Sequence, residues 1–441
     1  MKLLCITPEY PPDYGGGIAS FYGALLPALA RQGIDVTVVA GSAYSPSGSR
    51  GEDGGVHIVP LNHARAKFWA GQFPRLSLAP DLCRHLGAAW AAWEQTNGGR
   101  DFDVVECCDW GLQFVPWLSS EAPPCVVRLH GSIGQIARYD PQSGQALTET
   151  LAQLAEHALL PRAAARVTYG ARNQQWWQDQ LNAEVEHCPP PFCVSDAPSL
   201  DVPRPPHQGL VVGRLQSWKG PVTLCKALTA LGEDAPIIEW VGRDMPTPGT
   251  RAPMSTTLAQ DFPAVWGSRL RWYQPEPPDA IRQRQATSQF VVVPSEWDVF
   301  NLGAVEAMSQ GAIVICSDGA GASTLIEPGA TGFTYPAGDS DALAVAIRKT
   351  VRLSPDAAAH IGKAARATVQ ERLNPENIAR TTIKTYERAR MHKTRGLPMI
   401  GAFMPQKYPA AAVSRLGFAG LDRVPLQGLL KYIIKRTFTR R

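Results

Sequence analysis

The feature that most constrains the fold is an order of segments that occurs twice: an apolar run, a turn, a helix and another apolar run. In the first half, residues 3–7 have the pattern of a buried strand, a loop rich in Pro and Gly follows, and an apolar helix is expected over residues 18–32. Gly33 is the expected helix stop, and residues 36–40 form the next strand. Strands that alternate with helices in this way are typical of a parallel α/β sheet.

The second half repeats the pattern after a proline-rich interruption. Prolines gather at residues 189–191 and again at 203–206, a composition that favours a linker over a sheet interior. A helix is expected to begin at Pro221, because proline is favoured at the first helical position. Strands are expected at residues 210–212, 236–241, 290–293 and 313–316. The sequence therefore predicts two similar parallel sheets in tandem.

A length of 441 residues exceeds one ordinary domain, so we place a boundary near the first proline cluster. We predict a first domain over residues 1–190, a second over residues 191–375, a helix over residues 376–395 that returns to the first domain, and a tail over residues 396–441. A hydrophobic content of 44% and a charged content of 19% are near globular averages, which disfavours disorder and coiled coil.

Charge and cysteine usage exclude other classes. The tail carries eight Lys and Arg against one acid, whereas the other residues hold 35 basic and 38 acidic side chains, so the folded body gives no reason to expect nucleic-acid binding. Nine scattered cysteines without a Cys-x-x-Cys pair favour a reduced compartment. The N-terminal apolar run is too short for a signal peptide, and no run approaches the ~18 residues of a membrane span. We therefore expect a cytoplasmic protein.

Gly15, Gly16 and Gly17 lie where the first strand leads into the first helix. Glycines let the backbone approach a diphosphate, whose charge is attracted to the N–H groups of a helix N-terminus. The alternative is a tight turn without a ligand. The motif is not Gly-x-Gly-x-x-Gly, and the second strand ends without an acid, so a nicotinamide-dependent dehydrogenase is disfavoured.

Two cations, Arg214 and Lys219, lie five residues apart in the loop that leaves the first strand of the second half. This loop is expected at the carboxyl end of the sheet, where ligands of open α/β folds bind. Positioned cations there would stabilise a departing nucleoside diphosphate. The alternative is an ordinary solvated basic loop.

The most informative segment runs from Val291 to Gly311. A buried strand ends at Pro294, a loop carries Asp298, and a helix of small residues carries Glu306. Ionised carboxylates only accept hydrogen bonds, so Glu306 suits the two hydroxyls of a ribose and Asp298 suits the hydroxyls of a sugar. The alternative is a surface acid together with an acid favoured by the helix dipole.

From Pro294 to Gly311 the chain resembles the retaining family-four glycosyltransferases of the GT-B fold. Their fingerprint is a Glu, seven residues and a Glu, preceded by Pro-Ser and followed by Ala-Met and a Gly. The resemblance continues in the glycine loop and in residues 213–220 and 329–339, and it spans roughly residues 2–390. It implies an α/β fold in which two Rossmann-like domains face each other across a cleft.

The resemblance also implies roles for single residues. Gly16 is expected to approach the diphosphate, Arg214 and Lys219 to bind it, and Glu306 to hold the ribose. His130 matches a family histidine that lines the sugar site, although a lone His at a strand end is more often a structural hydrogen-bond partner. The expected catalytic residues are His130, Arg214, Lys219 and Asp298, and the expected donor-binding residues are Gly15, Gly16, Gly17, Arg214, Lys219, Asp298, Phe300, Asn301, Leu302 and Glu306.

Two positions depart from the family pattern and leave the donor sugar open. Asp298 stands where the family usually has Glu, which shortens the reach by one methylene, and Thr324 stands where another Glu is frequent. Trp110, Trp218 and Trp297 lie nearest to the motifs, but we assign none of them to the site because most buried tryptophan is core.

The expected reaction transfers a hexose from a UDP- or GDP-linked sugar to a hydroxyl of a glycan or lipid-linked acceptor, as in polysaccharide or glycoconjugate synthesis, with the anomeric configuration retained. Two cations and a helix terminus can replace Mg²⁺ electrostatically, so no metal or other cofactor is expected. Two alternatives are a GT-B-like sugar-nucleotide epimerase or phosphorylase, and a non-catalytic protein that binds a nucleotide-sugar or glycan.

The tail has the composition of an interfacial helix. Pro425 marks a helix start, and apolar residues recur at helical spacing among cations (Leu426, Leu429, Leu430, Ile433 and Ile434 among Lys431, Lys435, Arg436, Arg440 and Arg441). Residues 423–441 are expected either to contact anionic lipid at the cytoplasmic membrane face, beside a lipid-linked acceptor, or to pack on the body with a frayed basic end.

Overall fold

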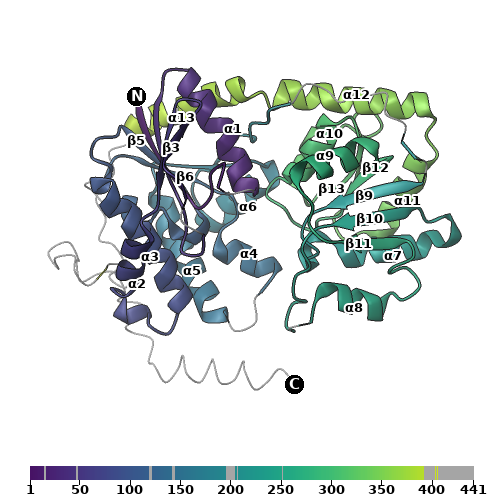
Figure 1. Cartoon of the computed structure of the whole chain (residues 1–441), viewed down its shortest axis with the longest axis horizontal. Helices are drawn as coiled ribbons and strands as arrows, with labels where there is room; N and C mark the ends of the chain where they lie inside the picture. Colours follow the sequence, from purple (N-terminus) through teal and green to yellow (C-terminus); the bar gives the residue numbers. More distant parts are fainter. Residues whose placement is uncertain are drawn as a thin grey trace.

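The computed structural model describes residues 1–391, apart from residues 14–15, 46–47, 119–121, 142–144, 195–203, 206 and 251, together with Phe403 and Pro405. It confirms the α/β class. Two sheets lie in separate halves of the molecule, each flanked by helices (Figure 1). Within the described residues, no helix has both the length and the apolar character needed to cross a membrane.

The first sheet has eight strands in the order β3-β4-β2-β1-β5-β6-β7-β8, and every pair is parallel except β3 with β4. Its strands are β1 (Lys2–Thr7), β2 (Asp35–Ala40), β3 (Gly51–Asp53), β4 (Val56–Pro60), β5 (Val104–Cys108), β6 (Cys125–Arg128), β7 (Ala165–Thr168) and β8 (Glu186–His187). The helices of this half are α1 (Gly17–Arg31), α2 (His63–Ala70), α3 (Pro80–Gln95), α4 (Ile133–Tyr139), α5 (Ala146–Leu159) and α6 (Ala171–Leu181).

The second sheet has six parallel strands in the order β11-β10-β9-β12-β13-β14. Its strands are β9 (Gln208–Val212), β10 (Ile237–Val241), β11 (Leu270–Tyr273), β12 (Phe290–Val293), β13 (Ile313–Ser317) and β14 (Phe333–Tyr335). The helices that follow these strands are α7 (Pro221–Leu231), α8 (Met254–Asp261), α9 (Pro278–Thr287), α10 (Leu302–Ser309), α11 (Ser340–Val351) and α12 (Pro355–Arg372).

Both faces of the first sheet are covered, which explains its apolar strands. In β1, Leu3 and Cys5 belong to a buried cluster that includes α1, whereas Leu4 and Ile6 belong to a second cluster that includes α3. Successive side chains of a strand point to opposite faces, so a strand buried on both faces becomes a continuous apolar run.

The last described helix, α13 (Pro375–Met391), crosses back from the second half and packs against α1 of the first (Figure 1). Its Tyr386 hydroxyl donates to Glu106 at 2.8 Å in the interior of the first half. Glu106 also accepts two bonds from Arg128, at 3.1 and 2.8 Å, in a pair that is almost fully buried. A buried carboxylate needs such partners, so α13 completes a polar cluster in the first core.

Each sheet reverses its strand order next to its first strand. β1 lies between β2 and β5, and β9 lies between β10 and β12. Ligands of open α/β sheets bind outside the carboxyl ends of the strands at such a reversal. The loops that follow β1, β6, β9 and β12 are therefore the places to look for the site, and they carry most of the residues selected from the sequence.

Candidate active site

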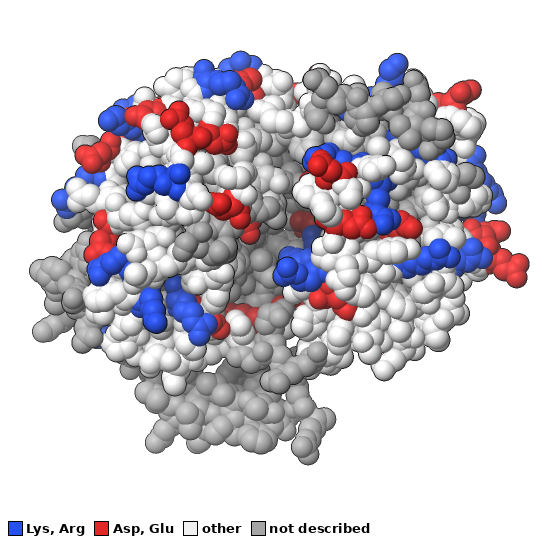
Figure 2. Space-filling model, in the orientation of Figure 1, with Lys and Arg blue, Asp and Glu red and all other residues white. Residues whose placement is uncertain are grey.

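Residues beyond the carboxyl ends of the two sheets are in contact, which shows that these ends face each other. Tyr139 at the end of α4 stacks on Trp297 with ring centroids 4.5 Å apart and planes 3° apart. Gln216 donates a short hydrogen bond to the buried Asp140. A furrow with acidic and basic side chains along its borders separates the two halves on the face shown in Figure 2.

Lys219 is held by its own loop and by the loop after β12. Gly220, which follows it, has a φ of +77°, and a Cβ there would lie 1.8 Å from the Pro294 carbonyl oxygen. Only glycine permits this approach, so the Lys-Gly sequence brings the two loops together. The Lys219 ammonium then lies 2.5 Å from the Asp298 carboxylate, with both side chains less than one-fifth exposed.

Trp218 provides an aromatic face beneath the two cations. The Lys219 Nζ lies 4.3 Å and the Arg214 guanidinium carbon 5.8 Å from the centroid of its ring. Burial lowers the pKa of Arg214, while Asp298, Asp140 and Glu9 oppose this. An arginine stays charged at any physiological pH, so two cations lie beside the Trp218 ring.

One oxygen of Asp298, Oδ2, accepts from two side chains. Besides Lys219, the Asn301 side-chain amide donates to its carboxylate at 2.9 Å. Asn301 has a φ of +79°, a conformation that asparagine tolerates, and its side-chain oxygen caps α10 by accepting the Ala304 N–H at 3.0 Å. The start of α10 therefore fixes the orientation of Asp298. Phe300 between them is buried and Leu302 is half-buried.

Glu306 lies on the second turn of α10 and is half-buried. Burial raises its pKa, whereas a hydrogen bond from Gln285 and the charge of Arg282 on α9 lower it. An acceptor in a partly desolvated position suits paired hydroxyl donors. Thr324, the second departure from the family pattern, donates its hydroxyl to the Gly321 carbonyl at 2.8 Å within its own turn.

The glycine loop contains a carboxylate that the sequence analysis did not select. Gly16 is the N-cap of α1 and Gly17 its first residue, while Gly15 lies outside the described residues. A Cβ on Gly16 would lie 2.4 Å from the Glu9 carboxylate. Burial raises the pKa of Glu9, and an N–H bond from Ala19 in the first turn of α1 lowers it. This helix N-terminus thus already has an anionic partner within the chain.

His130 follows β6, and its ring lies among aromatic side chains. The centroids of Phe21, Tyr22 and Tyr169 are 5.1, 5.2 and 5.1 Å away. The Tyr169 hydroxyl is 2.6 Å from its Nδ1 and 2.9 Å from its Nε2. Burial, and then the charge of Arg128, lower its pKa well below the usual range. A neutral imidazole donates from one nitrogen and accepts at the other, so His130 is suited to hydrogen bonding rather than to carrying charge.

The structure thus brings together the two loops of the second half, with Arg214, Lys219 and Asp298 in one cluster. It adds residues that sequence reasoning did not assign to the site: Glu9, Asp140, Gln216 and the stacked pair Tyr139 and Trp297. Trp297 lies in the segment from Val291 to Gly311, and Gln216 lies in residues 213–220. Only their contacts across the two halves distinguish them from core residues. No periodic pattern indicates such contacts.

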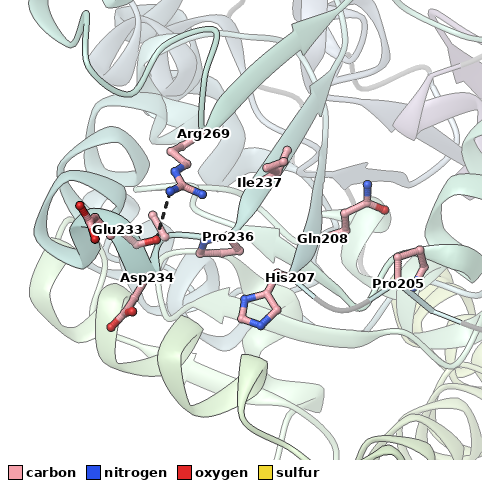
Figure 3. A pocket seen from close by; sticks show the side chains of 9 residues that line it. Pro205, His207, Gln208, Glu233, Asp234, Pro236, Ile237 and Arg269 are labelled. Atoms are coloured by element: carbon pink, nitrogen blue, oxygen red, sulfur yellow. Dashed lines mark hydrogen bonds between the residues drawn. The ribbon is translucent and has the colours of Figure 1, made fainter.

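A cavity of about 380 Å³ lies elsewhere, at the amino ends of β9 and β10. Figure 3 shows it beside the Arg269 guanidinium, which donates to the Glu233 carbonyl at 3.1 Å. Its position at the opposite end of the strands separates it from the candidate site. Among the described residues, no three His, Cys, Asp or Glu side chains are grouped as a metal ion would require. Metal independence stays a prediction.

Two family models match the chain. The glycosyl transferases group 1 model matches residues 198–368, and the glycosyl transferase 4-like domain model matches residues 16–183. The two models divide the chain as its two sheets do. The chain belongs to the family-four glycosyltransferases of the GT-B fold, and it is an enzyme of glycosyl transfer.

Individual relatives span nearly the whole enzyme. A glycosyltransferase of Methanocaldococcus jannaschii is 23% identical, with 88% of this chain and 98% of the relative covered. A D-inositol 3-phosphate glycosyltransferase of Corynebacterium efficiens is 28% identical over 80% and 88%. Among solved structures, sucrose-phosphate synthase from Thermosynechococcus elongatus has a TM-score of 0.67 at 21% identity, covering 88% and 98%. HepE of Anabaena in complex with UDP-glucose has a TM-score of 0.58 at 18% identity, covering 88% and 99%.

Proposed function

We propose that the enzyme transfers a hexose from a UDP-linked sugar to a hydroxyl of a glycan or lipid-linked acceptor, with retention of the anomeric configuration. The cluster of Arg214, Lys219 and Asp298 at the carboxyl ends of β9 and β12 carries this proposal. Two cations meet the charge of a diphosphate, and a carboxylate meets sugar hydroxyls. The UDP and UDP-glucose complexes of HepE support a uridine nucleotide, with a GDP-sugar as the alternative.

In the proposed reaction the bond between the anomeric carbon and the diphosphate oxygen breaks, and its electron pair leaves with the diphosphate. Arg214 and Lys219 stabilise that charge, which is greatest as the bond breaks. The acceptor hydroxyl attacks from the same face, and its proton passes to the departing phosphate oxygen. Glu306 holds the ribose, and His130 and Asp298 orient the hexose by hydrogen bonds.

Binding and product analysis test this proposal. A panel of UDP- and GDP-sugars is titrated by calorimetry, and the donor that binds is incubated with glycan and lipid-linked acceptors. NMR of the product then gives the anomeric configuration, which we expect to match that of the donor. An inverted product would overturn the retaining mechanism. Conversion of a nucleotide-sugar to its epimer without an acceptor would favour the epimerase alternative.

The basic tail leads to a second proposal, that residues 423–441 hold the enzyme at an anionic membrane surface. They lie outside the described residues, and the proposal depends on their sequence, in which each cation contributes about 1 kcal/mol near such a surface. Full-length protein should sediment with vesicles that contain phosphatidylserine but not with phosphatidylcholine alone. A chain truncated at residue 422 should stay in the supernatant with unchanged nucleotide affinity. Equal sedimentation of the two forms would contradict this proposal.

A further inference from the structure

Two carboxyl groups that the proposed reaction does not use lie beneath the loop that carries His130. Asp109 follows β5, Glu156 lies on α5, and both side chains are fully buried. Asp109 accepts the backbone N–H of His130 at 3.0 Å and that of Gly131 at 3.2 Å, one with each carboxylate oxygen. These two bonds hold the backbone immediately on either side of the His130 carbonyl.

Glu156 holds the other end of the same loop. It accepts the Ser132 hydroxyl at 2.7 Å and the Gly134 N–H at 3.1 Å, again one with each oxygen. The Ser132 oxygen in turn caps α4 by accepting the Gln135 N–H at 3.1 Å. A Cβ on Gly134 would lie 2.5 Å from the Glu156 carboxylate, so the backbone approaches this group as closely as a glycine permits.

Asp109 accepts from backbone N–H groups and the Cys108 thiol. Glu156 accepts from a backbone N–H group and the Ser132 hydroxyl. Arg128, the buried cation on the adjacent strand β6, is bonded to Glu106 instead. Burial raises the pKa of Asp109 to about 7 and that of Glu156 to about 8, and the charge of Asp109 adds to the rise for Glu156. The two groups therefore gain protons near neutral pH.

Besides the ion pair of Arg128 with Glu106, several titratable groups around these two carboxyl groups do not change charge near neutral pH. Burial raises the pKa values of Cys108 on β5 and Tyr169 after β7 well above their usual range, and it lowers that of His130 after β6 well below. His157 on α5 also has a lowered pKa because of burial. Asp109 and Glu156 are the groups bonded to this loop whose pKa values lie near neutral pH.

We propose that Asp109 and Glu156 are paired positioning residues, which as carboxylates hold residues 130–134 in the conformation that presents His130 to the donor sugar, and which hold the loop less firmly when protonated. The proposal rests on the function proposed above for His130. A protonated carboxyl group carries a hydrogen on one oxygen. Protonated Asp109 loses one of its two N–H bonds to the loop, whereas protonated Glu156 keeps the Gly134 N–H bond and reverses its bond to the Ser132 hydroxyl, which then accepts.

Activity and stability should then change in opposite directions with pH. Both groups have folded-state pKa values above their unfolded values, so the folded chain binds more protons than the unfolded chain between about pH 4 and 8. Stability should fall as pH rises through that range, whereas turnover should rise through pH 7 to 8. A side chain that served stability alone would make the two curves move together.

The test uses full-length Asp109→Asn and Glu156→Gln, with Asp179→Asn on the exposed face of α6 as a control. The amides keep the shape but offer only one acceptor oxygen. Asp109→Asn therefore loses one of two N–H bonds, whereas the Glu156→Gln amide can still donate to the Ser132 oxygen. At pH 8.5 we expect turnover of the donor selected by the panel to fall about 10- to 100-fold in Asp109→Asn and by less in Glu156→Gln, with KM for the donor within about threefold. We expect a flatter pH profile and a melting temperature no lower than wild type. The control should match wild type throughout.

Hydrogen exchange of the peptide over residues 129–136 gives a readout without substrate. After correction for intrinsic rates, we expect faster exchange in Asp109→Asn at pH 8.5 and in the wild type at pH 6 than in the wild type at pH 8.5. If an amide variant does not fold, exchange is measured instead in Ser132→Ala, which removes one donor to Glu156. Unchanged exchange, or a wild-type pH profile in the variants, would overturn the proposal. A wild type that turns over no nucleotide-sugar would instead refute the proposed function, while the exchange data still decide the role of the pair.

Discussion

The first and second halves of the molecule form the two walls of the candidate site, and they hold their polar groups in opposite ways. On the second half, Lys219 and Asp298 form an ion pair in which the side chains are 17% and 14% exposed. On the first half, Asp109 and Glu156 are completely buried and bind N–H and O–H groups, and His130 is neutral. Under the proposed function, the partly exposed ion pair of the second half can exchange partners with a charged ligand. The buried hydrogen bonds of the first half instead hold the shape of its loop before the ligand arrives.

The charged wall should show the largest effects. Arg214→Ala and Lys219→Ala should each lower turnover by about 10²-fold or more, because each removes a cation that stabilises the departing diphosphate. Initial rates of nucleotide release measure this. Lys226→Ala, an exposed lysine on α7, is the control and should match wild type. If both variants retain wild-type turnover, the diphosphate lies elsewhere and the contrast between the walls has no bearing on catalysis.

Glu306 should affect binding more than chemistry. Glu306→Ala should weaken UDP binding by roughly 10- to 100-fold, because the half-buried carboxylate proposed to accept from two ribose hydroxyls is lost. Titration calorimetry with free UDP measures the change without a sugar or an acceptor. The same titration with Glu327→Ala, an exposed acid of the same half, provides the reference. Equal affinities for UDP would remove Glu306 from the nucleotide site.

The stacked pair that joins the walls should have a smaller effect. Tyr139→Leu retains apolar bulk but removes the stacking on Trp297, which contributes about 0.5 to 1.5 kcal/mol. We expect kcat/KM to fall about 2- to 10-fold. Phe at the same position should restore most of the activity. A Leu variant with wild-type kinetics would show that the two walls come together without this contact.

Removal of divalent metal should have the smallest effect of all. The proposed charge stabilisers are side chains and backbone dipoles, so EDTA is expected to leave turnover within about twofold. Rates before and after dialysis against EDTA, with Mg²⁺ added back, measure this. A loss of activity that Mg²⁺ restores would mean that the cations of the second wall do not suffice for the diphosphate.

Sequence patterns predicted the positions of the long strands well, because β1, β9 and β12 are apolar runs next to clear turn residues. They also placed Arg214, Lys219 and Asp298 in loops at the correct edge. They could not predict that Lys219 contacts Asp298, since the approach depends on Gly220 lying against Pro294. Short strands such as β8, with two residues, carry too little periodicity to be recognised.

The first wall was harder to predict for a physical reason. Asp109 and Glu156 are acids in apolar surroundings, and their importance comes from backbone N–H groups far along the chain. A backbone donor has no signature in a sequence. Glu9, by contrast, is only seven residues from Gly16, yet the direction in which its side chain folds back on the loop is a property of the turn and not of residue type.

The return of α13 to the first half has a consequence for how the chain folds as it is made. Tyr386 supplies a hydrogen bond to Glu106, so the interior of the first half is incomplete until α13 has left the ribosome. At ~5 to 20 residues per second, synthesis of the stretch from His187 to Pro375 takes roughly 10 to 40 s. Throughout that interval the α1 surface that α13 covers stays open while the whole second half emerges and folds. A nascent chain stalled before residue 375 should therefore bind chaperones at this surface, and its release should coincide with the completion of α13.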